Sequence, residues 1–318
     1  MVSPSVQCFN LSKSFGNIRA VKDVSISIEA GSTVALVGPS GCGKTTVLRL
    51  IAGFEKANSG EVTIRNQTVD GPGVFLPPEK RKVGMIFQDY ALFPHLNVRQ
   101  NVEFGLTGKP KEPNSIDAML ELVGLENSGK RMPHELSGGE QQRTALARAL
   151  MPNPDVILLD EPFSNLDAGL RTSMRTSVRH ILKEARATSI LVTHDQDEAL
   201  SFADSVAVMH GGTILQVGTP IDVYTNPRSL TVSQFIGDAN LIKGTATDHI
   251  VETELGHLKT SNKAQGPVIA VVRPENIRIG SDQPTDLHLE VIDQEFYGHD
   301  KIIKLRLPSG LSLKARCS

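Results

Sequence analysis

The sequence has few cysteines, almost no net charge and no long apolar run. Its three cysteines, Cys8, Cys42 and Cys317, are scattered and odd in number, which predicts no disulfide framework. The formal net charge of −2 gives no reason to expect nucleic acid or an anionic membrane surface as a partner. No apolar run approaches the roughly 18 residues of a membrane helix, and the N-terminus lacks a basic start with an apolar core. We therefore expect neither a membrane span nor a secretory signal, and a reducing cytoplasm suits the free thiol of Cys42.

Over residues 1–237, short apolar segments alternate with helical patterns. Strands are indicated where β-branched residues form a short run or alternate with polar ones, and helices where apolar residues recur every three or four positions. Strands alternating with helices indicate an α/β domain whose mainly parallel sheet is covered on both faces. The strands are expected over 23–30, 33–37, 61–65, 83–87, 156–160, 189–193 and near 205–217, and the helices over 44–53, 139–150 and about 167–185.

Two regions depart from this alternation. The segment "SIDAMLELVGL" has its apolar residues on one helical face and indicates a helical subdomain, at about 90–150, inserted in the α/β domain. After Gly237, "VIAVVRPENIRI" and "LHLEVIDQEF" are short strand patterns with turn residues between them and no helical pattern. We therefore expect an α/β domain over 1–237 and a small all-β, barrel-like domain over 238–318. In the helical segment "SIDAMLELVGL", the apolar face consists of Ile116, Met119, Leu120 and Val123.

The most specific signal is "GPSGCGKTT" at 38–46, which fits G-x-x-x-x-G-K-[ST] and lies between a predicted strand and a predicted helix. The glycines let backbone N–H groups turn inward around phosphate oxygens, and the N-terminus of the following helix adds a favourable partial charge. Lys44 is expected to reach the β- and γ-phosphates, and Thr45 to ligate Mg²⁺. The predicted nucleotide-binding loop comprises Gly38, Pro39, Ser40, Gly41, Cys42, Gly43, Lys44, Thr45 and Thr46.

Polar residues follow three further apolar strands. Asp160 ends "VILLD", where a carboxylate can hold Mg²⁺ through its water shell. Glu161 comes next and is suited to act as general base for a water that attacks the γ-phosphate. His194 ends "SILVTH" and can place its imidazole beside the γ-phosphate, while Gln88 ends "VGMIFQ" and can contact Mg²⁺ or the attacking water. Because ligands bind at the carboxyl edge of parallel strands, we predict that these residues form one catalytic site.

Each strand end also has a plainer interpretation. An apolar strand that ends in Asp-Glu is common, a lone histidine is usually a surface or core residue, and Gln88 fits an ordinary polar strand end. The phosphate loop upstream in the same α/β chain favours the functional interpretation of Asp160, Glu161 and His194. For Gln88 both interpretations stay open.

Taken together, these residues resemble the ATP-binding subunit of an ATP-binding cassette (ABC) transporter. The motifs follow the family's order: the phosphate loop, Gln88, "LSGGE" at 136–140, "VILLDE" at 156–161, "SNLD" at 164–167 and His194. The resemblance covers nearly the whole chain. It implies an ATPase that uses ATP and Mg²⁺, with a P-loop NTPase domain, a helical subdomain and a small OB-like domain after them.

The resemblance also implies roles for residues outside the strand ends. Phe15 in "SKSFG" is expected to stack on adenine, and a core phenylalanine is the alternative. Ser137, Gly138 and Gly139 precede a predicted helix and are expected to form a second phosphate-binding surface. That surface closes over the ATP of a partner subunit in a two-fold dimer. Asp167 is expected in a loop that communicates across the dimer.

Two positions depart from the family pattern. Glu140 stands where Gln is commonest, and Asn165 stands where Ala is usual. Ser137 and its two following glycines are retained, and Asp167 is still present. We therefore expect function to survive the change at Glu140, and the change at Asn165 is a small one.

The last part of the chain resembles a subgroup of importers. "GTPIDVYTNP", "FIGDANLIKG" and "VVRPENIRI" are similar to members that carry a C-terminal OB-like regulatory (TOBE) domain and import maltose, polyamines, sulfate or ferric iron. The stretch "VFLPPEKRKVGMIFQDYALFPHLNV" at 74–98 is most similar to the ferric-iron branch. The chain stops at "LSLKARCS", earlier than the subgroup usually does, so we expect an abbreviated regulatory domain.

The resemblance implies partners and a place in the cell. The expected assembly is a homodimer of ATPase subunits with two integral-membrane permeases, at the cytoplasmic face of the inner membrane. An extracytoplasmic substrate-binding protein serves it, and no nucleic acid takes part. The segment "DYALFPHLNV" after Gln88 is expected to face a permease through Tyr90, Leu92 and Phe93, with the core of the helical subdomain as an equal alternative.

Three other classes use part of the same chemistry. Chromosome-organising and DNA-repair ATPases separate the halves of the site with long heptad-repeat arms, but no sustained heptads lie between Lys44 and Ser137. A kinase or GTPase explains the phosphate loop but neither "LSGGE" nor His194. Cassette proteins that act on ribosomes normally carry two cassettes in tandem, whereas this chain has one phosphate loop. The importer ATPase is therefore favoured.

Overall fold

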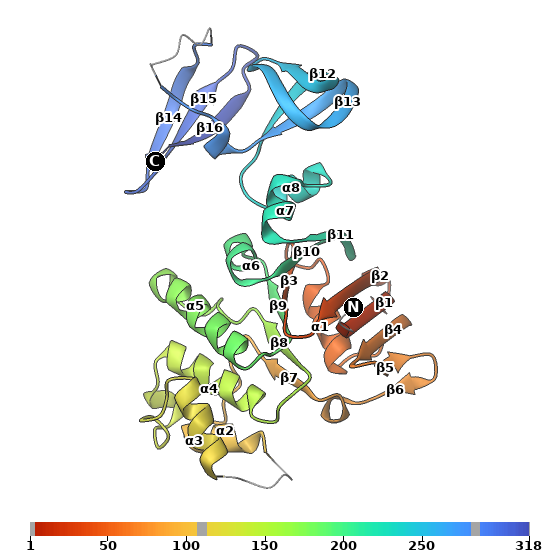
Figure 1. The fold of residues 1–318 in the computed structure, drawn as a ribbon, viewed down its shortest axis with the longest axis vertical. Helices are drawn as coiled ribbons and strands as arrows, with labels where there is room; N and C mark the ends of the chain where they lie inside the picture. The colour runs from red at the N-terminus through yellow and green to blue at the C-terminus, as the bar shows by residue number, and fades with distance from the viewer. Residues whose placement is uncertain (1–3, 107–112, 281–286, 318) are drawn as a thin grey trace. The chain divides into compact units, whose positions relative to one another are not determined.

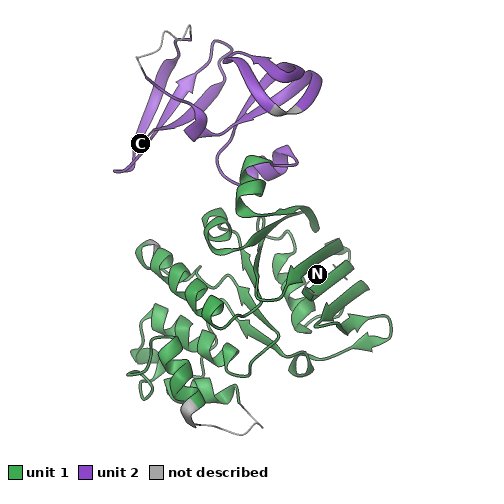
Figure 2. Cartoon of the chain, viewed as in Figure 1, with its two compact units in different colours: residues 1–226 green, residues 227–318 purple. Residues whose placement is uncertain are grey.

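The computed structural model describes residues 4–106, 113–280 and 287–317, and the chain divides into two compact units, 1–226 and 227–318 (Figure 2). The sequence changes character after 237, so the predicted boundary falls inside the second unit. Helix α8 (Leu230–Phe235) accounts for the difference. The buried Arg273 guanidinium donates from Nη1 to the carbonyl oxygens of Ser233 at 2.9 Å and Gly237 at 3.2 Å. The helix is thus fastened to the β-rich unit by side-chain contacts that sequence patterns do not show.

A six-stranded sheet forms the centre of the first unit (Figure 1). Its β-branched runs are buried along almost their whole length, as strands covered on both faces should be. Five strands are parallel, and the sixth runs antiparallel at one edge, which confirms the predicted α/β fold. The strand order is β11 (Thr213–Gly218), β10 (Ser205–His210), β3 (Thr33–Val37), β9 (Ser189–Thr193), β8 (Val156–Asp160) and β7 (Val83–Ile86).

A five-stranded antiparallel sheet is the second layer of this unit. Its order is β2 (Ile18–Glu29), β1 (Pro4–Phe15), β4 (Ser59–Ile64), β5 (Gln67–Gly71) and β6 (Val74–Phe75). The sequence predicted the strands at 23–30 and 61–65 but not β1. Register shifts along the pairing of β1 with β2, such as the one between Cys8 and Leu11, interrupt the strict alternation of apolar and polar residues. The periodicity of this strand was therefore weaker than its length of 12 residues would suggest.

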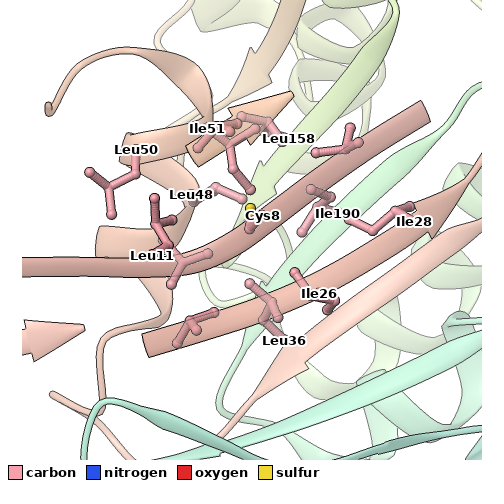
Figure 3. Close-up of a cluster of buried hydrophobic side chains, with 14 of the residues drawn as sticks. Cys8, Leu11, Ile26, Ile28, Leu36, Leu48, Leu50, Ile51, Leu158 and Ile190 are labelled. Atoms are coloured by element: carbon pink, nitrogen blue, oxygen red, sulfur yellow. The ribbon is translucent and has the colours of Figure 1, made fainter. Parts of the chain in front are cut away.

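Helix α1 (Lys44–Ala52) packs against both sheets and starts directly after the phosphate loop. One hydrophobic cluster contains Leu48 and Ile51 of this helix, Cys8 of the antiparallel sheet, and Leu36 and Leu158 of the parallel sheet (Figure 3). The helix ends at Gly53, whose φ of 86° is left-handed, as the predicted C-cap requires. The phosphate loop is therefore anchored on a rigid core rather than on a surface segment.

Arg81 is a buried cation that closes the far end of this helix. Its Nη1 donates to the carbonyl oxygens of Leu50 at 2.6 Å and Ile51 at 3.0 Å, and its Nε donates to that of Leu76 at 2.6 Å. Burial lowers the pKa of Arg81, while the charge of Asp70 opposes this effect. The guanidinium satisfies carbonyls that a helix end leaves unpaired, and it ties them to the segment after β6.

The helical subdomain follows β7 and contains α2 (Val98–Phe104), α3 (Pro113–Leu122) and α4 (Gly138–Leu150). Ile116, Leu120 and Val123 are buried and Met119 is half-buried, so the predicted apolar face is confirmed. Helix α5 (Ala168–Glu184) returns the chain to the sheet, and α6 (Gln196–Phe202) and α7 (Pro220–Thr225) follow. Across the described ranges, no helix has both the length and the apolar character needed to cross a membrane.

The second unit is built from strands after α8. A long hairpin pairs β12 (Asn240–Thr253) with β13 (Gly256–Val272), and a separate sheet has the order β14 (Glu290–Phe296), β15 (Lys301–Arg306) and β16 (Ser312–Cys317). The expectation of short strands was wrong for the hairpin, whose strands have 14 and 17 residues. Strand pairing continues past an irregularity between Asp248 and Ile250 that interrupts the sequence pattern. Both sheets share one core of Ile242, Ile303, Leu305, Leu307, Leu313 and Ala315.

Candidate functional site

The predicted site residues follow neighbouring parallel strands at a common edge. Val37 pairs with Thr193, and Val192 pairs with Asp160, so β3, β9 and β8 end at the same level. The loop after β3, the residue after β9 and the residue after β8 are therefore neighbours. They are the phosphate loop, His194 and Glu161, which is the arrangement predicted for the carboxyl edge of the sheet.

Close backbone packing explains the glycines of the phosphate loop. A Cβ on Gly38 would lie 2.2 Å from the carbonyl oxygen of Met209, and one on Gly43 would lie 2.3 Å from that of Ala20. Gly43 also has a φ of 105° at the N-terminus of α1, where no side chain caps the helix. The loop therefore turns tightly against β2 and β10 and leaves helix N–H groups without a side-chain partner, as an anion-binding loop requires.

Lys44 gives the loop a buried positive charge. The side chain is only 5% exposed, and its ammonium donates to the carbonyl oxygens of Gly38 at 2.7 Å and Pro39 at 3.0 Å. Cys42 Sγ lies 3.9 Å from the same nitrogen. No carboxylate in the described parts of the chain forms an ion pair with it. A buried cation held only by neutral groups is costly, so this lysine suits a phosphate anion.

Thr45 and Asp160 join the phosphate loop to β8. The hydroxyl of Thr45 donates to Asp160 Oδ1 at 3.1 Å. Burial raises the pKa of Asp160, the hydrogen bond from Thr45 opposes this, and the charge of Glu161 raises it further. Hydroxyl and carboxylate oxygens are the ligands that Mg²⁺ prefers, and a divalent cation would relieve the crowding of the two carboxylates. The residues present therefore fit Mg²⁺.

Glu161 and His194 form a pair beside this position. The Oε2 atom of Glu161 lies 3.1 Å from His194 Nδ1. Glu161 has a φ of 46°, a left-handed conformation that is uncommon outside glycine and that recurs at functional sites. Its backbone N–H donates to the carbonyl oxygen of Val192 at 3.0 Å, and the hydroxyl of Ser164 donates to its carbonyl oxygen at 2.8 Å. The strained backbone is thus held from both sides, and it aims the carboxylate at the histidine.

Gln88 is exposed two residues after β7, and its backbone has an unexpected partner. The amide of Asn165 donates from Nδ2 to the carbonyl oxygen of Gln88 at 2.8 Å. The residue that departs from the family pattern therefore connects the loop at 164–167 to the segment after β7. Sequence reasoning noted the departure but could not assign the contact, because the two residues lie 77 positions apart.

The segment "LSGGE" begins α4 with a reciprocal cap. Glu140 Oε2 accepts hydrogen bonds from the Ser137 backbone N–H at 2.8 Å and from the Ser137 hydroxyl at 2.9 Å. The Glu140 N–H donates to Ser137 Oγ at 3.4 Å, which completes a capping box. Arg131 Nη1 lies 2.6 Å from Glu140 Oε1. Ser137 is therefore engaged by a carboxylate of its own chain.

The remaining predicted residues lie at the margins of the site. Asp167 is the N-cap of α5, and its Oδ1 accepts from the N–H of Leu170 at 2.9 Å. Phe15 is 46% exposed near the tip of the β1–β2 hairpin, with the Lys13 ammonium 4.9 Å from its ring centroid. An exposed ring is available for stacking, and the alternative of a core phenylalanine is not favoured by this exposure.

The predicted residues thus separate into two groups. The phosphate loop, Asp160, Glu161 and His194 meet at one sheet edge, and Gln88 follows the neighbouring strand. Residues 136–140 begin a helix of the helical subdomain, and within the described ranges no hydrogen bond or ion pair joins them to 38–46. One chain therefore presents two distinct glycine-rich helix N-termini.

Comparison with known proteins identifies the class. The family described as "ABC transporter" matches residues 21–164, a range that includes the phosphate loop, Ser137 and Asp160. With the relatives described next, this shows that the chain belongs to the ABC transporter family and is one of its ATP-binding, ATP-hydrolysing proteins.

Three curated relatives carry one name. "Fe(3+) ions import ATP-binding protein FbpC 2" of Rhodococcus jostii is 46% identical over 94% of this chain and 86% of its own length. The FbpC protein of Pseudomonas fluorescens is 48% identical over 85% of this chain and 77% of its own length. That of Haemophilus influenzae is 40% identical over 96% of this chain and 90% of its own length.

Two solved structures share the fold. The cbiO1 protein of Clostridium perfringens, described as part of an ABC transporter complex, matches with a TM-score of 0.63 and 28% identity over 70% of this chain and 90% of its own. A dimeric ATP-binding cassette in a post-hydrolysis state with ADP and Pi matches with a TM-score of 0.58 and 31% identity, over 68% of this chain and 98% of its own. The fold class is therefore confirmed.

Proposed function

We propose that this protein is the ATP-hydrolysing subunit of a ferric-iron importer and works as a homodimer beneath two membrane permeases. The observation that carries the catalytic part is the bond from Thr45 to Asp160, because it joins the phosphate loop to the strand that ends in Glu161. The ferric-iron part is supported by the names of relatives that are 40–48% identical over most of the chain.

The chain's own residues supply each part of the hydrolysis. The backbone N–H groups of residues 38–46 hold the phosphates of ATP, and Lys44 neutralises the β- and γ-phosphate oxygens. Mg²⁺, when bound, adds further charge neutralisation there, and Thr45, Asp160 and Gln88 are the residues that would hold it. Phe15 offers its exposed ring to the adenine.

Glu161 acts as the general base. Its carboxylate takes a proton from the attacking water as the oxygen approaches the γ-phosphorus, and the γ-phosphoryl group leaves ADP. His194, paired with the carboxylate through Nδ1, orients it and stands beside the γ-phosphate. The held left-handed backbone at residue 161 keeps this geometry in place before the substrate arrives.

The second glycine-rich N-terminus, at Ser137, Gly138 and Gly139, completes the site of a partner subunit. It starts a 13-residue helix, long enough to offer a positive end to an anion. A two-fold dimer would place this end over the partner's phosphate loop and form two shared sites. The dimeric state of the structurally similar cassette supports this arrangement. Asp167, at the start of α5, faces the same interface.

Exposed aromatic side chains suit contact with the permeases. Phe54, Phe87 and Phe104 are 49%, 37% and 51% exposed, and Phe54 and Phe87 have ring centroids 6.2 Å apart. Tyr90 is only 5% exposed, so it belongs to the core instead. Leu92 and Phe93 are half-buried, which is an exposure between that of Tyr90 and that of the three exposed phenylalanines. The subunit then acts at the cytoplasmic face of the inner membrane, and an extracytoplasmic binding protein delivers the cargo.

Transport measurements test this function. In cells that lack the chromosomal copy, the wild-type chain should restore ATP-dependent uptake of radiolabelled ferric iron, and Glu161→Gln should not. Uptake of a polyamine, sulfate or a sugar is measured in the same cells. Restoration of one of these without iron would keep the ATPase role and overturn the cargo. Wild-type chain without any ATPase activity, alone or with its permeases, would overturn the function itself.

A further inference from the structure

Arg171, near the start of α5, contacts two loops that belong to different parts of the site. Its Nη2 donates to the carbonyl oxygen of Leu166 at 3.0 Å, in the loop that ends at Asp167. Its Nη1 lies 3.8 Å from Asp195 Oδ2, in the residue that follows His194. One side chain therefore bridges the loop expected at the dimer interface and the loop that carries the histidine.

A closed hydrogen-bond network fixes the residues on either side of His194. Asp195 caps α6, where its Oδ1 accepts from the N–H of Asp197 at 2.8 Å and of Glu198 at 3.2 Å. The Thr193 hydroxyl accepts from the Asp195 N–H at 3.0 Å and donates to Glu198 Oε2 at 2.6 Å. The histidine is therefore carried by a short hydrogen-bonded segment. Its charged contacts with α5 run through Asp195, which pairs with Arg171, and through Glu198, which feels the charges of Arg175 and Arg171.

A small cavity lies beside Arg171. A cavity of about 80 Å³ is lined by Arg171, Glu161, His194 and Glu198, among others. Arg171 Nε and Arg175 Nη1 are both buried and have no hydrogen-bond partner in the described parts of the chain. Buried donors usually have partners, and a cavity of this size is roomy enough for water. The Arg171 guanidinium thus has partners at Nη1 and Nη2, whereas its buried Nε has none in the described parts of the chain.

We propose that Arg171 is a positioning residue that couples the loop at 164–167 to His194, an inference that rests on the proposed function. The planar guanidinium is rigid, so its two amino groups cannot move independently. When a partner subunit shifts Leu166 and Asp167, Arg171 moves with the Leu166 carbonyl and changes its contact with Asp195. The shift thereby reaches the pair formed by His194 and Glu161. Closure of the dimer and alignment of the catalytic pair become one event.

A purely structural role for Arg171 makes a different prediction. If the side chain only held α5 and α6 together, its loss would lower stability and affect ATP affinity and turnover alike. Arg179 provides a matched control, because it lies on the same helix and donates from Nη1 to the Ser201 carbonyl oxygen of α6 at 3.2 Å. It joins the same two helices away from the site.

Steady-state ATPase of the full chain is measured for wild type, Arg171→Gln, Arg171→Lys and Arg179→Gln, with thermal unfolding of each. Arg171→Gln should lower kcat about tenfold and leave the KM for ATP within about twofold. Arg171→Lys should recover little, since one ammonium cannot replace a two-ended fork. Arg179→Gln should leave kcat unchanged. A kcat of Arg171→Gln within about twofold of wild type, or equal losses in both arginine variants, overturns the coupling.

A second readout does not depend on turnover. The imidazole NMR signal of His194, assigned by its loss in His194→Asn, is compared in wild type and Asp167→Ala. Moving the capped loop should shift the signal in wild type and leave it unshifted in the Arg171→Gln background. Equal shifts in both backgrounds overturn the coupling even where the ATPase function holds. Wild-type chain without ATPase activity is the separate failure of the proposed function.

Discussion

The two glycine-rich helix N-termini of this chain differ in charge, although the sequence predicts that both bind phosphate. At the start of α1, the buried ammonium of Lys44 is held by two carbonyl oxygens, and no side chain caps the helix. At the start of α4, the carboxylate of Glu140 accepts from both the N–H and the hydroxyl of Ser137. The first N-terminus is ready to receive an anion, whereas the second is already occupied by one.

The surroundings of Glu140 account for this difference. Hydrogen bonds from the Ser137 backbone lower the pKa of Glu140 most, burial opposes this, and the Ser137 hydroxyl and Arg131 lower it further. The carboxylate is therefore ionised near neutral pH and masks the serine. A phosphate that approaches Ser137 must displace this carboxylate, so we expect the N-terminus of α4 to bind free phosphate weakly.

The largest effect is expected from Lys44→Ala. The change removes the only buried cation of the phosphate loop, so ATP hydrolysis should be abolished and ATP binding weakened, as measured by steady-state turnover and a fluorescent ATP analogue. Lys80→Ala, at an exposed position, is the control and should be neutral. Activity within tenfold of wild type corresponds to a loss of only about 1.4 kcal/mol and would contradict the assigned role.

Glu161→Gln should separate binding from hydrolysis. The amide keeps the shape of the side chain but cannot take a proton from water, so ATP stays bound and turnover stops. Size exclusion in ATP should then show a stabilised dimer. His194→Ala should also cut turnover severely, with a smaller effect on ATP binding. A Glu161→Gln monomer with normal turnover would rule out the base.

Mixing two inactive chains tests whether the two N-termini meet across a dimer. Lys44→Ala chains and Ser137→Arg chains each form homodimers with two damaged sites. In the mixed dimer both lesions fall in one shared site, so the other is intact and ATPase activity should return.

If no activity returns, the intact site either needs its twin or is not shared. Cysteines placed at residues 40 and 137 distinguish these outcomes by cross-linking. A disulfide between opposite chains supports the shared site, whereas one formed only within a chain would contradict it.

The smallest effect is expected from Glu140→Gln, which bears directly on the difference between the two N-termini. Glutamine preserves the capping box and removes the negative charge that competes for Ser137. In the Glu161→Gln background, the dimer should form at an ATP concentration about threefold lower, and the gain should shrink at high salt. Arg131→Gln should shift the concentration in the opposite direction. Equal shifts for both variants would show a role in stability alone.

The sequence predicted the site best where one strand positions one residue. Asp160 ends β8, and Glu161 and His194 directly follow β8 and β9, so their positions at the sheet edge could be predicted from two short, almost fully buried strands. The contacts between loops were not predictable. Asn165 binds the carbonyl oxygen of Gln88, which is far away in sequence. Arg171 reaches the carbonyl oxygen of Leu166 only in a particular side-chain conformation. Sequence patterns predict helices and strands from their periodicity, but they do not predict where an individual side chain points.

The fold, too, was predictable where the sequence pattern is regular and not where it depends on individual contacts. Buried parallel strands and the apolar face of α3 were predicted because their periodicity is unbroken. Strand β1 was missed because register shifts interrupt its alternation. The edge of the second unit lies at 226/227 because Arg273 fastens α8 to it, a contact made by one residue more than 30 positions away.

The buried guanidinium of Arg81 has a consequence for how the first unit comes apart. It joins the last turn of α1 to the carbonyl oxygen of Leu76, so the helix cannot fray at that end without breaking this cluster of hydrogen bonds and exposing an unpaired charge to the apolar core. Fraying of the helix and detachment of the segment around residue 76 therefore belong to one cooperative opening. The amide hydrogens of Leu50 to Phe54 are then expected to exchange with solvent only in that larger event.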